Sequence, residues 1–290
     1  MPYIAADDGV KLYYEEAGQG TPILFVHEFM GEYRSWEAQL RYFSRRYRCI
    51  AYNARGYPPS DVPDRAEDYG FERQRAGVLA MLNGLGIDKA HVVGLSMGAF
   101  ATFYFGMKWP ERALSLTLAG IGSGSMADSR AKFRQESEAA ADKLLAEGWE
   151  KSVAARSQSP TRVQLQNKDP RGFAEFVELV KQHSAKGSAL TLKGYQALRP
   201  SLDDFREEME KCRVPTLIIS GDEDEPCLDA SLMLKRHMPS AGLVFMPQTG
   251  HACNLEEPEL FNAVCDKFFH QVESGQYRMR DSRATPDRIF

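Results

Sequence analysis

Short apolar runs of strand length alternate with segments of helical spacing along most of this 290-residue chain. Turn residues bound each run, which is typical of the buried strands of a parallel sheet. The runs are Pro22–Val26, Cys49–Tyr52, His91–Val93, Leu114–Ala119, Pro215–Ser220 and Leu243–Met246. The helical segments are Ser35–Tyr47, Tyr69–Leu85, Met97–Lys108, Ser231–His237 and Pro258–Val272. This alternation predicts an α/β fold, with a mostly parallel central sheet and helices on both faces.

The alternation stops between about Gly124 and Pro200, where the chain is polar and mainly helical. Ala131–Glu147 and Phe173–His183 are its amphipathic helix candidates. An insertion between two strands is expected to lie over the carboxyl edge of the sheet, where open α/β sheets bind ligands. The expected organisation is a core of residues 1–122 and 202–275, a helical cap of residues 123–201, and a tail of residues 276–290. The arginine-rich tail is expected either to be mobile or to wrap a neighbouring subunit.

Composition excludes several classes of function. With 43% hydrophobic and 26% charged residues, the chain has enough apolar material for a full core. A net charge of -4 and the absence of a basic stripe argue against nucleic acid as a partner. No stretch approaches the roughly 18 apolar residues of a membrane helix, and the N-terminus has no secretory pattern. The five scattered cysteines include no CxxC pair, which favours free thiols in the cytoplasm.

The strongest chemical signal is Gly94-Leu95-Ser96-Met97-Gly98, which follows the strand His91–Val93 and opens the helix Met97–Lys108. A tight strand-to-helix turn exposes the serine hydroxyl at the edge of the sheet. Glycine is expected at both flanking positions because the turn leaves no room there for side chains. The N–H groups at the start of the helix point toward the same place. The pattern predicts that Ser96 is a nucleophile.

Two later loops supply the groups that a serine nucleophile needs. Gly250-His251 follows a late strand and precedes the last helix, and a neutral imidazole there can accept the hydroxyl proton. The loop Asp222-Glu223-Asp224-Glu225 follows the strand Pro215–Ser220, and one of its carboxylates can orient the histidine. The four acids leave the choice open at this point. The chain order of serine, acid and histidine is that of the nucleophile-elbow hydrolases.

Taken together, these motifs resemble those of the α/β-hydrolase superfamily, and in particular its capped serine hydrolases. His27-Glu28-Phe29-Met30-Gly31 stands where the family usually has His-Gly-x-x-Gly, and Asn53-Ala54-Arg55-Gly56 opens a second family motif that continues to Ser60. The family's Gly-x-x-Asp pattern after Val214–Ser220 selects Asp224 rather than Asp222 as the acid. The resemblance spans about residues 3–272 except for the cap, and it implies the α/β-hydrolase fold with a Ser96, His251 and Asp224 triad.

The resemblance also implies an oxyanion hole made by the backbone N–H groups of Met97 and Phe29, with Glu28 as an alternative to Phe29. Glu28 departs from the family pattern, which has glycine there. Its carboxylate would oppose the charge of an oxyanion, so it is expected to point away or to be neutralised. A sharper hypothesis is that Glu28 contacts a polar or cationic group of the substrate. His27 and Arg55 are expected to be structural.

The cap is expected to shape the substrate pocket. Four of its aromatic side chains either line that pocket or form the cap's own core, and the second alternative is favoured. They are Trp149, Phe173, Phe176 and Tyr195.

The expected reaction is hydrolysis of a small or medium ester or lactone through an acyl-enzyme. Carbon–carbon cleavage of a dienoic diketone is the main alternative, and amide cleavage and perhydrolysis stay open. A non-catalytic small-molecule binding protein on the same fold is the alternative from another class, although such proteins often lack a triad member. No cofactor or metal is expected, because no ligand spacing such as HxxxH or CxxC occurs. The expected partner is a small-molecule substrate, with self-association left open.

Overall fold

The computed structural model describes residues 2–284, and these residues form an eight-stranded sheet in the order β1-β2-β4-β3-β5-β6-β7-β8. The strands are β1 Tyr3–Ala5, β2 Lys11–Ala17, β3 Pro22–Val26, β4 Arg48–Tyr52, β5 Ala90–Leu95, β6 Ala113–Ala119, β7 Thr216–Gly221 and β8 Ala241–Met246. At one edge, β1 pairs antiparallel with β2, and β2 pairs antiparallel with β4. From β4 onward in the sheet order, all neighbouring strands pair in parallel. The expected α/β fold with a mostly parallel sheet is confirmed.

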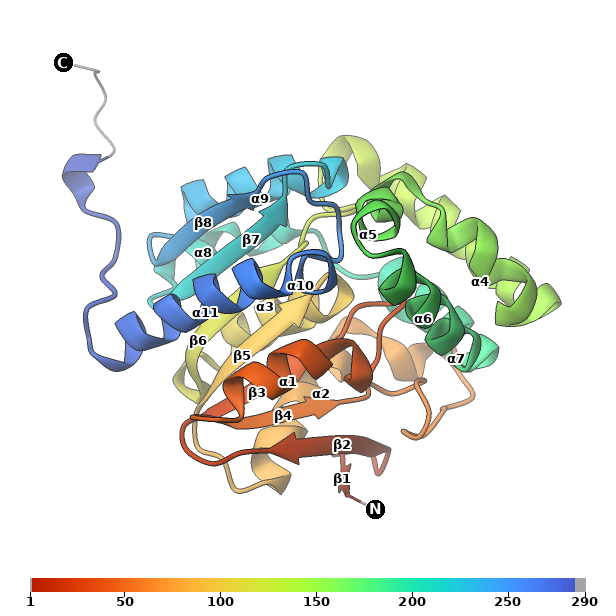
Figure 1. Cartoon of the computed structure of the whole chain (residues 1–290), viewed down its shortest axis with the longest axis horizontal. Helices are drawn as coiled ribbons and strands as arrows, with labels where there is room; N and C mark the ends of the chain where they lie inside the picture. Colours follow the sequence, from red (N-terminus) through yellow and green to blue (C-terminus); the bar gives the residue numbers. More distant parts are fainter. Residues whose placement is uncertain (1, 285–290) are drawn as a thin grey trace.

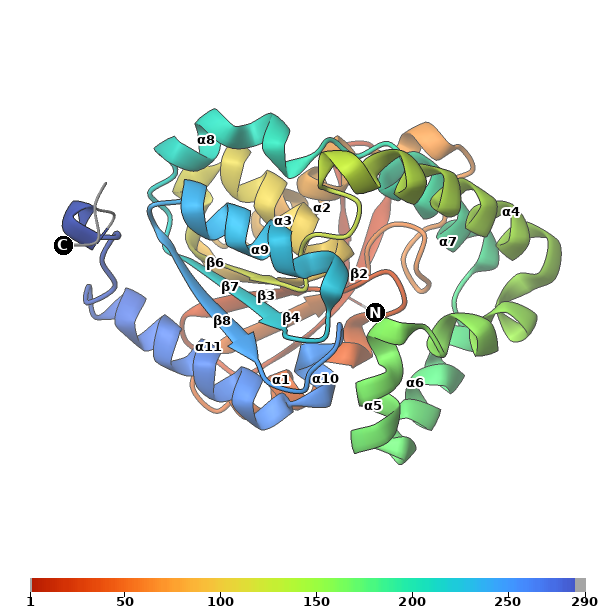
Figure 2. The ribbon, with the colours of Figure 1, turned by 90° about the horizontal axis from the view of Figure 1, so that it is seen from above.

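Helices cover both faces of this sheet (Figures 1 and 2). The main helices of the core are α1 Glu37–Phe43, α2 Phe71–Gly84, α3 Met97–Lys108, α8 Arg206–Lys211, α9 Glu225–His237, α10 Cys253–Glu256 and α11 Pro258–Glu273. Side chains alternate between the faces along each strand. In β3, Leu24 joins the apolar cluster of α2, α3 and α9, whereas Phe25 joins that of α1 and α11. The two clusters hold the sheet between two helical layers.

Between β6 and β7 the chain forms a set of helices beyond the carboxyl ends of the parallel strands (Figures 1 and 2). They are α4 Ala127–Ser157, η4 Pro160–Arg162, α5 Val163–Lys168, α6 Pro170–Lys181, α7 Ala185–Thr191 and the π-helical turn η5 Leu192–Gln196. We refer to residues 123–201 as the cap, with boundaries that remain a prediction from the sequence. Because the cap lies over this edge of the sheet, its side chains reach the turn that carries Ser96.

Most of the predicted helices have somewhat different bounds in the structure, and two of the differences have a clear local cause. The helix expected at Ala131–Glu147 runs on to Ser157, with a break at Gly148, where φ is 71°. Glycine tolerates that value, so the chain turns there and resumes a helix. The helix expected at Ser231–His237 already begins at Glu225. Pro226 is compatible with this start because a first-turn residue needs no N–H partner.

Buried polar contacts hold together the loops that precede β2 and follow β4. Arg55 is 1% exposed, and its guanidinium pairs with Asp8 at 2.8 Å and donates to the Asp68 carbonyl at 2.6 Å. These contacts are those expected of a structural cation. At the other end of the chain, the Tyr277 hydroxyl donates to the Thr216 carbonyl at 3.0 Å and Arg280 donates to the Arg236 carbonyl at 2.9 Å. The beginning of the tail therefore binds its own chain, whereas residues 285–290 lie outside the described residues.

Among the helices that the structure describes, none combines the length and the apolar character required to cross a bilayer.

The substitution Gly98→Ala should lower the free energy of unfolding by about 3 kcal/mol. A Cβ at this position in α3 would lie 2.1 Å from the backbone oxygen of Val26, which has no room to move. Gly77→Ala in α2 is the matched control, since its Cβ would meet only Leu12 and Tyr52 at ordinary distances of 3.6 and 3.9 Å. That variant should be stabilised by about 0.4–1 kcal/mol. Urea unfolding of both variants provides the measurement, and equal effects would contradict this account.

Candidate active site

Ser96 lies in the turn between β5 and α3, with φ of 53° and ψ of -114°. A non-glycine residue at positive φ costs of order 1–3 kcal/mol, so the surrounding contacts must impose this conformation. Two of those contacts are close backbone approaches that only glycine permits. A Cβ on Gly94 would lie 2.3 Å from the Gly98 carbonyl oxygen, and one on Gly98 would lie 2.1 Å from the Val26 carbonyl oxygen. The glycines expected from the sequence are therefore required by the packing on both sides of the serine.

The structure brings Ser96, His251 and Asp224 into one hydrogen-bonded chain. His251 Nδ1 lies 2.7 Å from Asp224 Oδ2, and His251 Nε2 lies 2.7 Å from Ser96 Oγ. A carboxylate only accepts hydrogen bonds, so the neutral ring carries its proton on Nδ1. Nε2 is then the acceptor for the serine hydroxyl. This is the geometry that a general base needs to take the proton of a nucleophile.

Asp224 occupies the turn that follows β7 and precedes α9. Its side chain is fully buried, whereas the nearby Asp222 accepts a hydrogen bond from the Thr249 N–H at 3.2 Å. The helix N-terminus at Asp224 also favours a negative charge. The structure thus gives the two aspartates different partners, and it is Asp224 that contacts the imidazole.

The contact between His251 and Asp224 raises the pKa of the histidine and lowers that of the aspartate relative to their ordinary values. Burial by itself lowers the pKa of His251, but the charge of Asp224 and the hydrogen bond to it outweigh burial and hold that pKa above 6.5. For Asp224, burial by itself raises the pKa, whereas the His251 charge and hydrogen bonds lower it below 3.8. The carboxylate is therefore ionised near neutral pH and stabilises an imidazolium whenever one forms.

The backbone around His251 is fixed from two directions. The carboxylate of Glu256 accepts hydrogen bonds from the N–H groups of Gly250 at 2.6 Å and Ala252 at 3.0 Å. The N–H of His251 itself donates to the carbonyl of Thr161 at 2.9 Å, and Thr161 belongs to the cap. Both the final helical region and the cap therefore position the imidazole.

The loop after β3 carries Phe29, whose N–H was expected to act with that of Met97. Within residues 2–284, neither N–H donates a hydrogen bond to a protein acceptor. The carbonyl of Phe29 accepts from the Tyr57 hydroxyl at 2.9 Å, which fixes the orientation of the following peptide. Two free N–H groups on either side of a nucleophile are the arrangement that stabilises an oxyanion. Their role in catalysis remains a prediction.

His27 bonds within the same loop. Its Nε2 accepts from the Ala54 N–H at 3.0 Å, so the proton is on Nδ1, which lies 2.7 Å from the Glu28 carbonyl oxygen. Burial lowers the pKa of His27 to about 4, and the ring is therefore neutral. These contacts fit the structural role expected from the sequence.

Glu28 is buried and forms an ion pair with Arg162 of the cap. Burial alone would raise the pKa of Glu28, but the Arg162 charge and hydrogen bond lower it below 4.5. The expectation that this carboxylate is neutralised is thus met by a cation that is 134 residues away in sequence. Among the described non-glycine residues, only Ser96 and Gln248 have positive φ, so Glu28 does not need the glycine backbone of the family pattern. Contact between Glu28 and a substrate remains a prediction.

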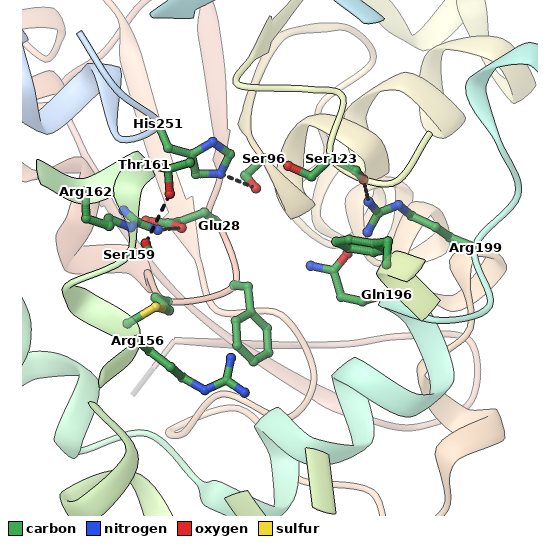
Figure 3. Close-up of a pocket in the computed structure, with 13 residues that line it drawn as sticks. Glu28, Ser96, Ser123, Arg156, Ser159, Thr161, Arg162, Gln196, Arg199 and His251 are labelled. Atoms are coloured by element: carbon green, nitrogen blue, oxygen red, sulfur yellow. Dashed lines mark hydrogen bonds and ion pairs between the residues drawn. The ribbon is translucent and has the colours of Figure 1, made fainter. Parts of the chain in front are cut away.

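A cavity of about 260 Å³ opens over Ser96 (Figure 3). It is lined by residues of the turn at Ser96, the loop after β3, the loop that carries His251, and the cap. They are Glu28, Phe29, Met30, Ser96, Ser123, Phe133, Arg156, Ser159, Thr161, Arg162, Gln196, Arg199 and His251. The four cap aromatics considered from the sequence are not among them. Trp149, Phe176 and Tyr195 are instead buried in the apolar core, as the favoured alternative predicted, and Phe173 packs against it.

No sequence pattern marked the three arginines of the cavity, or Glu256, as residues of the site. The arginines lie in polar helical stretches where arginine is common on the surface. Their position in the cavity depends on how the cap folds over the sheet, which no local pattern records. For Glu256, its place shortly after His251 was the only available signal.

The described residues contain one cluster of His, Cys and acidic groups close enough to share a metal ion, namely Asp224, Cys227 and His251, whose ligand atoms lie within 4.8 Å of one another. Two of these residues belong to the hydrogen-bonded chain at Ser96. A metal there would take the atoms that orient the imidazole, so it would compete with that chain.

Comparison with known proteins identifies the family. A family model described as alpha/beta hydrolase fold matches residues 21–258. A 3-oxoadipate enol-lactonase of Acinetobacter baylyi is 27% identical over 281 residues, covering 93% of this chain and 94% of the relative. A 2-hydroxy-6-oxo-6-phenylhexa-2,4-dienoate hydrolase of Burkholderia cepacia is 27% identical over 265 residues, covering 88% and 89%.

Solved structures share the fold. The crystal structure of the enol-lactonase from Burkholderia xenovorans LB400 superposes with a TM-score of 0.79 at 22% identity, covering 93% of this chain and all of that chain. At this identity the likeness concerns the fold.

The rate of Ser96-dependent hydrolysis should fall as the pH drops through the pKa of His251, because a protonated imidazole cannot accept the serine proton. Asp224→Asn removes the charge that raises this pKa, so the acid limb of kcat/KM should move to lower pH. The same change should reduce kcat by about 10⁴-fold through loss of the correct tautomer. Asp222→Asn is the control and should leave the midpoint in place. A midpoint that moves equally in both variants would argue against the assignment of Asp224.

Glu28→Gln should reduce the free energy of unfolding by about 3 kcal/mol, because it leaves the buried Arg162 without its counter-ion. The double variant Glu28→Gln/Arg162→Gln should recover much of this loss, since the two residues act as a pair. Arg171→Ala, which breaks an exposed pair with Glu175, should cost less than about 1 kcal/mol. Chemical denaturation measures these variants together with the single variant Arg162→Gln, and strict additivity of the Glu28→Gln and Arg162→Gln changes would show that the pair is not coupled.

Proposed function

Because this chain belongs to the alpha/beta hydrolase family and is an enzyme of the hydrolase class, we propose that it cleaves a small or medium ester or lactone through an acyl-enzyme on Ser96. The observation that carries the proposal is the continuous contact from Asp224 through His251 to Ser96, with 2.7 Å at each step. Likeness to a 3-oxoadipate enol-lactonase supports the substrate class.

In the first half of the reaction, Ser96 Oγ attacks the carbonyl carbon while its proton passes to His251 Nε2. The carbonyl oxygen becomes an oxyanion that accepts hydrogen bonds from the Met97 and Phe29 N–H groups. Asp224 stabilises the imidazolium. The intermediate then collapses, the carbon–oxygen bond of the ester breaks, and His251 returns the proton to the leaving alcohol.

In the second half, a water molecule takes the place of the leaving group. His251 Nε2 removes one of its protons, and the resulting hydroxide attacks the acyl carbon. When the second tetrahedral intermediate collapses, its bond to Ser96 Oγ breaks, His251 returns the proton to Oγ, and the carboxylic acid is released. For a lactone, the alcohol and the acid remain parts of one molecule.

Carbon–carbon hydrolysis of a diketone is the second candidate. It is supported by likeness to the Burkholderia cepacia 2-hydroxy-6-oxo-6-phenylhexa-2,4-dienoate hydrolase, at the same 27% identity as the lactonase. The ester or lactone reaction is preferred because the cavity of about 260 Å³ suits a small substrate.

A fluorophosphonate probe should label the wild-type protein on one serine, and Ser96→Ala should not be labelled. Ester hydrolysis should fall by at least about 10⁴-fold in Ser96→Ala and in His251→Ala. Ser123→Ala is the matched control, because Ser123 also lines the cavity but does not contact His251. Labelling that persists in Ser96→Ala would exclude Ser96 as the nucleophile.

A panel of neutral esters, lactones, amides and dienoic diketones decides between the reactions. We expect the highest kcat/KM for an ester or a lactone. Faster cleavage of the diketones, with the same loss in Ser96→Ala, would select the second candidate.

A further inference from the structure

Arg199 lies just after η5, where the chain returns from the cap to the core, and it lines the cavity over Ser96 (Figure 3). The residue is 2% exposed. Its Nη2 donates to the carbonyl of Ser123, whereas Nε and Nη1 have no hydrogen-bond partner among the described residues. Buried donors nearly always have an acceptor, so these two atoms point to a missing one.

Two aromatic rings hold the guanidinium of Arg199. Its central carbon lies 3.8 Å from the centroid of Phe100 and 4.8 Å from that of Phe133. Stacked rings fix the plane of a guanidinium and leave its edges for hydrogen bonds. A carboxylate can accept two parallel hydrogen bonds from such an edge.

The charges of the cavity are not balanced. Arg156, Arg162 and Arg199 face one carboxylate, Glu28, and that carboxylate is paired with Arg162. Within residues 2–284, Arg156 and Arg199 form no ion pair with any acid. Burial lowers the pKa of Arg199 to about 10, which still leaves the side chain charged at neutral pH. The cavity therefore presents two uncompensated cations to a ligand.

The position of Arg199 relative to His251 indicates which part of a substrate it meets. His251 delivers the proton to the leaving group, so the leaving group must lie on the His251 side of Ser96. In Figure 3, Ser96 lies between His251 and Arg199. Arg199 is thus on the side of the acyl group.

We propose that Arg199, with Arg156 adding positive charge to the same cavity, binds a carboxylate of the acyl group remote from the reacting carbonyl, so that the substrate is a monoester of a dicarboxylic acid or a lactone of a hydroxydicarboxylic acid. This inference rests on the proposed function, and it adds a class of acyl group. Arg199 is a binding residue in this proposal and takes no part in proton transfer.

The test uses 4-nitrophenyl monoesters of succinic, glutaric and adipic acid, each compared with the ester that carries a carboxamide in place of the free carboxylate. Wild-type protein should prefer the carboxylate by at least about 10-fold in kcat/KM for the best chain length. Arg199→Gln should lose about 10- to 100-fold on that substrate, mainly in KM, and less than about 3-fold on the carboxamide.

Arg130→Gln is the matched control. Arg130 donates to the carbonyls of Gly124 and Arg199 at the junction between core and cap, but it does not line the cavity. The Arg130→Gln variant should change kcat/KM for the carboxylate ester and for the carboxamide ester by the same factor. If Arg130→Gln removed the carboxylate preference as fully as Arg199→Gln, the effect would come from the junction, and the proposal would be wrong.

If Arg199→Gln does not fold, measurements on the wild-type protein still test the proposal. In an inhibition assay with a neutral ester as substrate, glutarate should compete more strongly than inorganic phosphate or glutaramide does. Equal rates on both ester types, or stronger competition by phosphate, would overturn the carboxylate subsite while leaving Ser96-dependent hydrolysis intact. Failure of the proposed function would give a different result, because no ester would then be cleaved and the fluorophosphonate probe would not label Ser96.

Discussion

The contact between Gly98 and the carbonyl of Val26 sets the geometry of the whole site. Because neither Gly94 nor Gly98 carries a Cβ, the start of α3 can press against the end of β3, where a side-chain atom would lie 2.1 Å from a backbone oxygen. That approach holds Ser96 at positive φ. It also sets the N-terminus of α3 beside the loop that carries Phe29, so one packing constraint positions both Ser96, the proposed nucleophile, and the two N–H groups proposed to bind the oxyanion.

The fold was predictable from the sequence because its signals are local. A strand such as Pro22–Val26 or a helix such as Met97–Lys108 is marked by its own residues, and the structure reproduces both bounds. The serine, acid and histidine loops were predictable because each directly follows a strand. The contacts of the cap were not predictable, since Arg162 reaches Glu28 across 134 positions and no periodicity records such a distance. The same holds for Arg199, whose neighbours are fixed only when the cap has folded.

Electrostatics explains how the chain tolerates a buried carboxylate beside the proposed oxyanion site. The family pattern has glycine where this chain has Glu28, and the cap supplies Arg162 to pair with it. The pair keeps a buried charge compensated, as a desolvated carboxylate requires. Among the residues that the structure describes, Arg156 and Arg199 have no acidic partner, and they leave the cavity positive. The field at Ser96 therefore depends on the cap as much as on the core.

The hydrogen bond from the His251 N–H to the Thr161 carbonyl has a consequence for how this enzyme can be remodelled. A lid that only covered a finished active site could be exchanged for that of a relative without loss of turnover. Here the three-residue turn η4 provides a hydrogen-bond partner for the His251 backbone and the counter-ion for Glu28. A chimaera that replaces the turn along with the rest of the cap would alter the imidazole as well as the pocket, so the exchange boundaries should leave residues 160–162 in place.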